Sequence, residues 1–194
     1  MSDIELRTES VGEYDNNVYV LVDRATNESI LVDTPFEPEK IEKLTRGTTV
    51  KFILLTHGDY DHLQALTEMK RATGAPVAIH PKDAHNLPEP PDRFIEDGDI
   101  FEFGSSSVRA IYTPGHTAGS ISLVSDGILL SGDTLFPGGP GNTKRPGGDF
   151  AAVIASVEKL LSLPDDTQVY PGHGKSTTIG AEKPHLQEWK DRGY

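Results

Sequence analysis

The chain has 194 residues, enough for a sizeable core, and we expect residues 1–194 to form one domain. Its 30 acidic and 18 basic residues give a net charge of −12 with no Lys/Arg-rich run, so neither nucleic acid nor an anionic membrane is an expected partner. Cysteine is absent, which excludes disulfides, thiolate nucleophiles and cysteine-based zinc sites. A metal ion must therefore bind through His, Asp or Glu, and the expected partner is a small molecule.

The opening residues 1–10 are charged and contain no apolar core of the kind that a signal peptide needs. No later stretch approaches about 18 consecutive apolar residues, the length of a membrane-spanning helix. We therefore expect a soluble, cytoplasmic protein.

The first half alternates short apolar segments with helical patterns. Segments bounded by turn residues predict strands over 17–23, 29–33 and 51–56. The last contains a run, 52–55, that does not alternate and so predicts a strand covered on both faces. Helical spacing lies between strands over 37–46 and 63–73, and Gly74 is a plausible end for the second helix.

The second half is richer in strands. Closely spaced apolar segments joined by short Gly/Ser/Asp turns predict a meander of strands over 99–103, 107–113, 120–125 and 127–133. A helix over 150–161, a strand over 168–170 and a final helix near 181–192 follow. The Pro/Gly-rich segment 136–148 is either a domain linker or a loop, and we interpret it as a loop beside a site because the same pattern continues on both sides.

The segment HGDYDH, residues 57–62, directly follows a predicted strand. Alone it is as typical of a solvated turn as of a metal site. Three further residues, His116, Asp133 and His173, also come just past predicted strand ends, and loops leaving one edge of a sheet structure can converge. The resulting candidate cluster is His57, Asp59, Asp61, His62, His116, Asp133 and His173.

Imidazole and carboxylate groups together suit zinc, iron or manganese, and the cluster is large enough for two ions. Two ions roughly 3.5–4 Å apart need a bridging anion, which the carboxylate of Asp133 could provide. Such ions lower the pKa of a bound water from about 15.7 to about 7, so hydroxide becomes available at neutral pH. Hydrolysis is the natural use of this chemistry.

Four motifs in order, HGDYDH, TPGHTAGS, SGDTLF and PGHG, make the chain resemble the metallo-β-lactamase fold superfamily. The later GDTLF, PGHG and TTIG segments are most similar to its glyoxalase II-like metallohydrolase branch. The resemblance spans residues 30–180 and implies a mixed α/β fold, an αββα four-layer sandwich of two mixed β-sheets with helices outside.

The resemblance also implies a role for each matched residue. It implies a first metal held by His57, His116 and Asp59, a second held by Asp61, His62 and His173, and a bridge at Asp133, with Asp61 also orienting the attacking hydroxide. Because Asp61 and His62 directly precede the predicted helix at Leu63, we expect them at a helix N-terminus. Asp33, at the end of the 29–33 strand, either orients a ligand histidine from the second shell or is a strand-ending turn residue.

Asp59 departs from the pattern of the superfamily. The usual signature is HxHxDH, and Asp59 replaces its second histidine. Flavodiiron relatives carry Glu at this position and bind iron. Either Asp59 is an anionic ligand that favours iron or manganese at the first metal, or it points away and the first site is weak.

The function implied is a hydrolase that cleaves a thioester, ester or lactone by attack of a metal-bound hydroxide, with two divalent ions, zinc first and iron or manganese as alternatives. The chain stops about 20 residues after PGHG, too early for the helical glutathione-binding domain of glyoxalase II. Lys144 and Arg145 either meet an anionic substrate or lie in a solvated loop. The rival functions are an iron-dependent oxidoreductase similar to persulfide dioxygenases and a weakly active, single-metal or non-catalytic member. Nothing in the sequence indicates the oligomeric state.

Overall fold

A computed structural model describes residues 3–193 and contains two six-stranded β-sheets. The strands of the first sheet lie in chain order: β1 (Ile4–Val11), β2 (Asn16–Asp23), β3 (Glu28–Val32), β4 (Thr49–Leu54), β5 (Val77–Ile79) and β6 (Arg93–Phe94). The second sheet has the order β14 (Thr177–Thr178), β13 (Gln168–Pro171), β10 (Ile128–Gly132), β9 (Ile121–Ser125), β8 (Ser106–Tyr112) and β7 (Ile100–Phe103). Both sheets are mixed, since β3 pairs parallel with β4 and β10 pairs parallel with β13.

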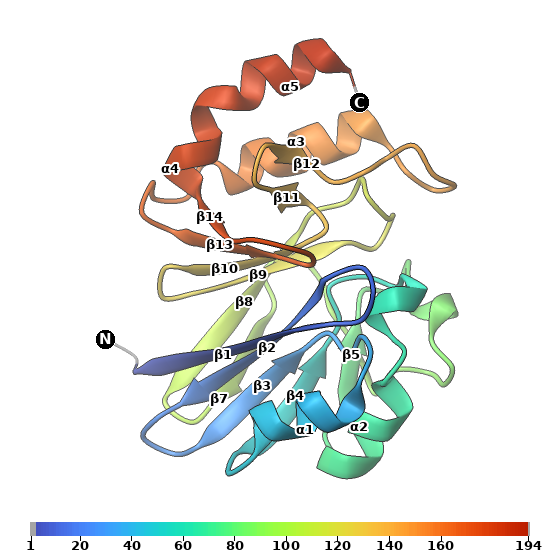
Figure 1. Ribbon diagram of the computed structural model, residues 1–194, viewed down its shortest axis with the longest axis vertical. Helices are drawn as coiled ribbons and strands as arrows, with labels where there is room; N and C mark the ends of the chain where they lie inside the picture. The colour runs from blue at the N-terminus through green and yellow to red at the C-terminus, as the bar shows by residue number, and fades with distance from the viewer. Residues whose placement is uncertain (1–2, 194) are drawn as a thin grey trace.

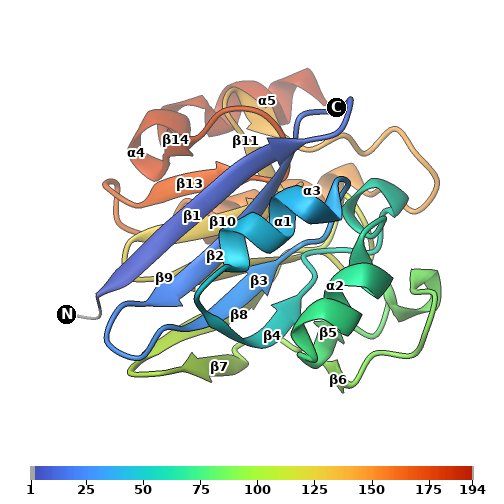
Figure 2. The same ribbon diagram turned by 60° about the horizontal axis from the view of Figure 1, so that its bottom comes forward.

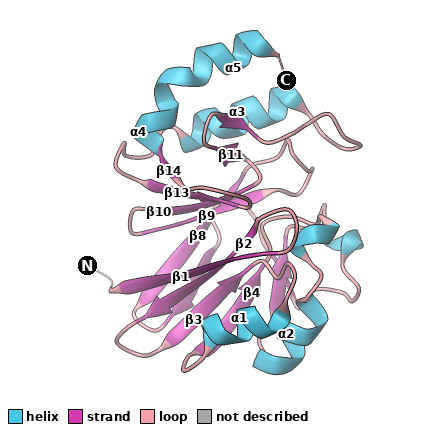
Figure 3. Cartoon of the chain, in the orientation of Figure 1, coloured by secondary structure: helices cyan, strands magenta, loops and turns pink. Residues whose placement is uncertain are grey.

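Helices cover the outer face of each sheet (Figures 1 and 3). On the first sheet lie α1 (Pro38–Thr45) and α2 (Leu66–Thr73), and on the second lie α3 (Phe150–Leu160), α4 (Ile179–Glu182) and α5 (Leu186–Arg192). Short 3₁₀ turns occur at Tyr60–His62, Ala84–Asn86 and Lys183–His185, and a small hairpin pairs β11 (Leu135–Phe136) with β12 (Gly139–Pro140). The predicted αββα sandwich of two mixed sheets is confirmed.

Strand β2 shows why two layers of core form. Its side chains alternate between two apolar clusters: Val18 and Val20 pack with the helices α1 and α2, whereas Tyr19 and Leu21 pack against the second sheet. All four are buried, as expected for a strand covered on both faces. Figure 2 shows α1 lying across β2 and β3, with α2 beside it.

The predicted strands, the meander and the end of α2 at Gly74 are confirmed, but the predicted start of α2 is wrong. The helix begins at Leu66, and Asp61 and His62 lie in the preceding 3₁₀ turn. Two carbonyls after β3, those of Thr34 and Pro35, accept hydrogen bonds from the backbone N–H of Ala65, which ties this segment down before the helix starts. The helix N-terminus therefore does not act on Asp61 and His62 in the predicted way.

Two other differences have simple causes. The predicted final helix is divided into α4, a 3₁₀ turn and α5, because Pro184 within that turn has no backbone N–H to donate. Strand β1 was missed because its sequence is charged and most of its side chains are half-buried or exposed, as is typical of an edge strand. Among residues 3–193, no helix combines the length and the apolar character needed to cross a bilayer.

Candidate metal centre

The candidate ligands lie in loops that follow strand ends. His57 and the 3₁₀ turn come after β4, and His116, Asp133 and His173 come after β8, β10 and β13. Strands β8, β10 and β13 run in the same direction, because β9 is antiparallel to both β8 and β10, and β13 is parallel to β10. Their carboxyl ends therefore meet at one edge of the second sheet, as the sequence predicted.

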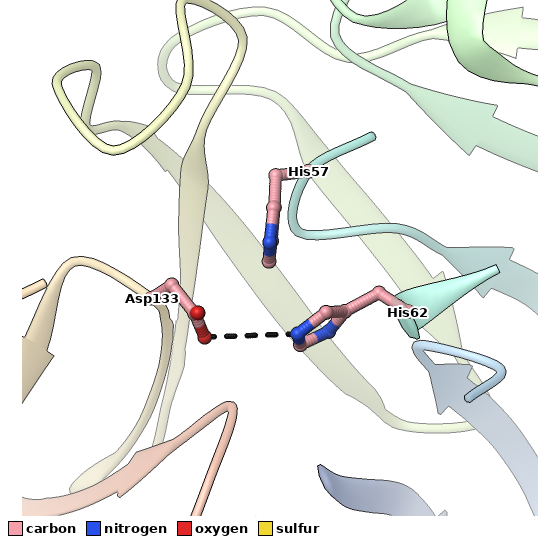
Figure 4. Close-up of side chains that lie close together, drawn as sticks. All are labelled: His57, His62 and Asp133. Carbon is pink, nitrogen blue, oxygen red and sulfur yellow. Dashed lines mark ion pairs between the residues drawn. The ribbon is translucent and has the colours of Figure 1, made fainter. Parts of the chain in front are cut away.

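The structure brings all seven predicted ligands into one cluster. Three groups have potential ligand atoms that all lie within 4.8 Å of one another: His57 with Asp59 and His116, Asp61 with His62 and His173, and His57 with His62 and Asp133. We refer to His57, Asp59 and His116 as the first group and to Asp61, His62 and His173 as the second group. Figure 4 shows the group between them, with Oδ1 of Asp133 3.7 Å from Nε2 of His62.

Asp133 lies between the two groups. Its Oδ2 is 3.5 Å from Nε2 of His116 in the first group and 3.4 Å from Nε2 of His173 in the second. Burial alone would raise the pKa of Asp133, but the hydrogen bond with His173 and the charges of His62, His57 and His116 hold that pKa well below its usual range. Asp133 is therefore an ionised carboxylate placed to contact ions in both groups.

Hydrogen bonds orient three of the imidazoles. Nδ1 of His116 lies 2.8 Å from the carbonyl oxygen of Asn142, and Nδ1 of His173 lies 2.8 Å from that of Tyr14. Nδ1 of His62 lies 3.0 Å from Oδ2 of Asp33. Carbonyl and carboxylate oxygens only accept, so each Nδ1 carries a hydrogen, and in the neutral imidazole each Nε2 keeps a lone pair that faces the cluster.

The fourth histidine is oriented through a hydroxyl. Thr56 donates its hydroxyl hydrogen to Oδ2 of Asp33, at 2.8 Å, so its oxygen accepts from Nδ1 of His57, at 3.0 Å. Asp33 thus supports one histidine from each group, directly for His62 and through Thr56 for His57. Asp33 therefore contacts His62, one of the predicted ligands, whereas its role in orienting a metal ligand stays a prediction.

Two buried atoms of the cluster, Nε2 of His57 and Oδ1 of Asp133, have no hydrogen-bond partner among the described residues. Buried polar atoms are normally paired, so such atoms need an explanation. A divalent cation supplies one, because the free atoms are an imidazole nitrogen and a carboxylate oxygen, both metal-ligand types. The residues present therefore fit a metal ion.

The pKa of His62 indicates what balances the carboxylates when no metal is bound. Burial alone would lower this pKa, but the hydrogen bond that His62 donates to Asp33 and the charges of Asp33, Asp133 and Asp61 raise it to about 9. A protonated His62 is then a cation among these carboxylates. Metal ligation needs the neutral imidazole, so binding an ion at the second group displaces this proton.

Asp59 points into the cluster rather than away from it. Its Oδ2 is 3.1 Å from Nε2 of His116 and 3.5 Å from Nε2 of His57. The alternative in which Asp59 points away is therefore wrong, whereas its ligation of a metal stays a prediction. Burial alone would raise the pKa of Asp59, but its contacts with His116, His57 and Arg145 hold that pKa far below its usual range.

Arg145 forms an ion pair with Asp59 through its two terminal guanidinium nitrogens, Nη1 and Nη2. Nη2 lies 2.6 Å from Oδ1, and Nη1 contacts Oδ2 and also lies 2.9 Å from Nε2 of His116. Segment 136–148 lies at the site, as predicted, although it also contains the strand β12 of the small hairpin. The alternative in which Arg145 lies in a solvated loop is wrong. The sequence offered no signal for this contact, because Arg145 and Asp59 are 86 positions apart.

Two further residues that shape the cluster were not predicted. Asn16, at the start of β2, donates from Nδ2 to Oδ2 of Asp61 at 2.9 Å. Asp83 joins the two loops of the first group, since it accepts from the N–H of Gly58 at 3.0 Å and from the hydroxyl of Thr117 at 2.6 Å. Their sequence neighbourhoods are ordinary turn segments, which explains why they were missed.

Two hollows border the cluster, and Tyr60, whose side chain is 76% exposed, lines both of them. One, of about 590 Å³, is lined by residues that include Asp59, Leu63 and Arg145. The other, of about 560 Å³, is lined by Tyr14, Tyr60, Asp61 and His173. Both groups are therefore next to space that a small molecule can enter.

A family model described as the metallo-beta-lactamase superfamily matches residues 11–173. The probable metallo-hydrolase YqgX of Bacillus subtilis is 33% identical, over 89% of this chain and 92% of its own length. A hydroxyacylglutathione hydrolase of Cereibacter sphaeroides is 36% identical, over 82% of this chain and 62% of its own length.

Several solved structures are also similar to this chain in fold and in sequence. The BLEG-1 B3 metallo-beta-lactamase superposes with a TM-score of 0.88 and 29% identity, covering 95% of this chain and 99% of its own. ETHE1 from Myxococcus xanthus has a TM-score of 0.84 and 28% identity, covering 94% and 83%. TTHA1623, solved in a di-iron-bound form, has a TM-score of 0.79 and 34% identity, covering 91% and 96%.

Proposed function

This chain belongs to the metallo-β-lactamase superfamily, and we propose that it is a metal-dependent hydrolase of a thioester, ester or lactone, similar to glyoxalase II. The observation that carries the proposal is the convergence of four Nε2 lone pairs and the carboxylate of Asp133 on one cluster beside open hollows. We propose two divalent ions, zinc first, held by the first and second groups. Divalent ions in such a centre polarise a carbonyl group and lower the pKa of a bound water.

The protein's own residues supply positioning and proton acceptance. Asp133 lies between the groups and is held ionised, so its carboxylate can contact an ion in each group. Asp61 borders the hollow beside Tyr60, and the amide of Asn16 fixes one of its oxygens. A carboxylate in this position can orient a water molecule and accept its proton.

The substrate class is supported by the hollows and by the sequence. The hollows are of a size for small molecules, and Tyr14 and Tyr60, which are 65% and 76% exposed, offer aromatic faces next to Asp61. The hydroxyacylglutathione hydrolase relative supports thioesters as the first class to test.

The test combines elemental analysis with a panel of thioesters, lactones and β-lactams. We expect bound zinc, or zinc with iron, and turnover that a chelator removes and added Zn²⁺ restores. No metal-dependent turnover of any member of the panel would reject the hydrolase.

A second candidate is an iron-dependent oxidoreductase. It is supported by the anionic Asp59 in the first group, which favours a harder metal, and by the di-iron-bound form of TTHA1623. One iron per chain with oxygen uptake on a persulfide, and no hydrolysis, would select this candidate over the hydrolase.

A further inference from the structure

The first group differs from the second in having a permanent cation, supplied by a neighbouring loop, among its potential ligand atoms. The guanidinium of Arg145 makes a two-pronged contact with Asp59, and its Nη1 also lies 2.9 Å from Nε2 of His116. These are two of the three side chains of the first group. Nη1 therefore engages the same atoms that the group would offer to a metal ion.

The contact with His116 cannot coexist with metal ligation. Nδ1 of His116 is bonded to the carbonyl oxygen of Asn142, so the imidazole has one free lone pair, on Nε2. That lone pair either accepts a hydrogen bond from Arg145 or ligates a metal ion. A metal ion in the first group must therefore break the contact between Arg145 and His116.

The second group has a neutral neighbour in the corresponding place. Asp61 accepts from the amide of Asn16, and Nε2 of His62 and Nε2 of His173 lie 3.2 Å apart. An amide does not repel an incoming cation as a guanidinium does. The two groups thus oppose metal entry to different degrees.

We propose that Arg145 is a tethered cation that occupies the first group in place of a metal ion, so that the protein fills its second group first and its first group weakly. The inference rests on the proposed function only in that the protein binds divalent metal. It adds that metal content depends on whether Arg145 is displaced. It also explains how the chain tolerates Asp59, since the guanidinium neutralises that carboxylate when no metal is present.

The loop holds Arg145 firmly enough for this role. The N–H of Gly148 donates to the carbonyl of Arg145 at 3.0 Å, and the N–H of Asp149 donates to the carbonyl of Gly115, one residue before His116, at 2.8 Å. A Cβ added at Gly148 would lie 2.2 Å from the carbonyl oxygen of Thr143, so the turn is tight. The side chain of Arg145 is only 31% exposed. The turn that carries Arg145 is therefore hydrogen-bonded, through Asp149, to the loop that carries His116.

The test is calorimetric titration of Zn²⁺ into chelator-stripped protein, comparing the wild type with Arg145→Gln. We expect two binding events in the wild type, with the weaker one at least about 10-fold weaker than the other, the scale of one charge-assisted hydrogen bond. In Arg145→Gln the weaker event should tighten by about 10-fold or more while the stronger event stays unchanged. Lys144→Gln, the adjacent cation, is the matched control and should match the wild type.

The outcomes separate the inference from the function. Two events of equal affinity in the wild type, or a first-group event that weakens in Arg145→Gln, would overturn the inference and leave the metallohydrolase standing. No Zn²⁺ binding by either protein would overturn both. Thermal melting of the metal-free proteins checks folding, and Arg145→Lys, which keeps the charge but loses the two-pronged contact, should fall between the wild type and Arg145→Gln.

Discussion

The two groups of the cluster use the same residue types but are supported differently. In the second group, Nδ1 of His62 is bonded to the buried Asp33, and Asp61 is bonded to a neutral amide. In the first group, His57 is supported through a hydroxyl, and Asp59 is bonded to a guanidinium that also reaches His116. Two groups with the same residue types can therefore bind metal differently, because the side chains that contact their ligands differ. The first group contains a permanent cation from a neighbouring loop, whereas the charged partner in the second group is the carboxylate of Asp33.

The largest expected effect on metal content comes from removing Asp133, which lies between the two groups. Asp133→Ala should lose metal from both groups and reduce metal-dependent turnover by more than about 100-fold, beyond the usual effect of a second-sphere change. Elemental analysis after dialysis, alongside the hydrolysis assay, measures both. Loss of a single equivalent would contradict the bridging role.

Asp33→Asn tests the support of the second group. Asn can still occupy the space, but its amide does not provide the carboxylate that Nδ1 of His62 and the hydroxyl of Thr56 both contact. We expect the stronger Zn²⁺ event to weaken by about 10-fold to 100-fold. An effect confined to the weaker event would show that Asp33 acts mainly through Thr56 and His57.

Asp59→His tests the first group, because it restores the HxHxDH signature and removes the carboxylate that Arg145 grips. We expect the weaker Zn²⁺ event to tighten by up to about 10-fold, with the preference for iron over zinc reduced. Titrations of Zn²⁺ and Fe²⁺ into the stripped protein measure this directly. An unchanged weaker event would count against Asp59 as a ligand.

The same contrast separates what sequence could predict from what it could not. The seven candidate ligands follow strand ends, so a pattern of strands and short motifs was enough to bring them together. The partners that distinguish the two groups were not available in this way: Asn16 lies 45 positions from Asp61, and Arg145 lies 86 positions from Asp59. Such contacts depend on how loops from separate layers approach each other, and no local periodicity encodes that. The start of α2 was wrong for the same reason, because distant carbonyls decide it.

The smallest effect on metal binding is expected from a substitution far from both groups, at Asp23, where β2 ends and the turn after it begins. The buried Asp23 accepts hydrogen bonds from the hydroxyls of Ser105, at 2.6 Å, and Ser106, at 2.8 Å, and it also bonds Thr26. These bonds, led by those of Ser105 and Ser106, lower the pKa of Asp23 well below its usual range. Its folded pKa is below its unfolded pKa of about 3.9, so its contribution to stability is present above about pH 4 and lost as the pH falls further.

Asp23→Asn should therefore lower the thermal midpoint at pH 7 and narrow that difference as the pH falls below about 4. Thermal melts of the metal-free wild type and variant between pH 7 and pH 3 measure it. Zn²⁺ affinity at pH 7 should not change in either event, because this turn does not contact the cluster through any of the hydrogen bonds named. A difference in midpoint that persists undiminished at low pH would show that packing, rather than the charge of Asp23, is responsible. A change in Zn²⁺ affinity would instead mean that a loss of overall stability alters metal binding. The effects of Asp59→His and Arg145→Gln would then need comparison with variants of equal thermal midpoint.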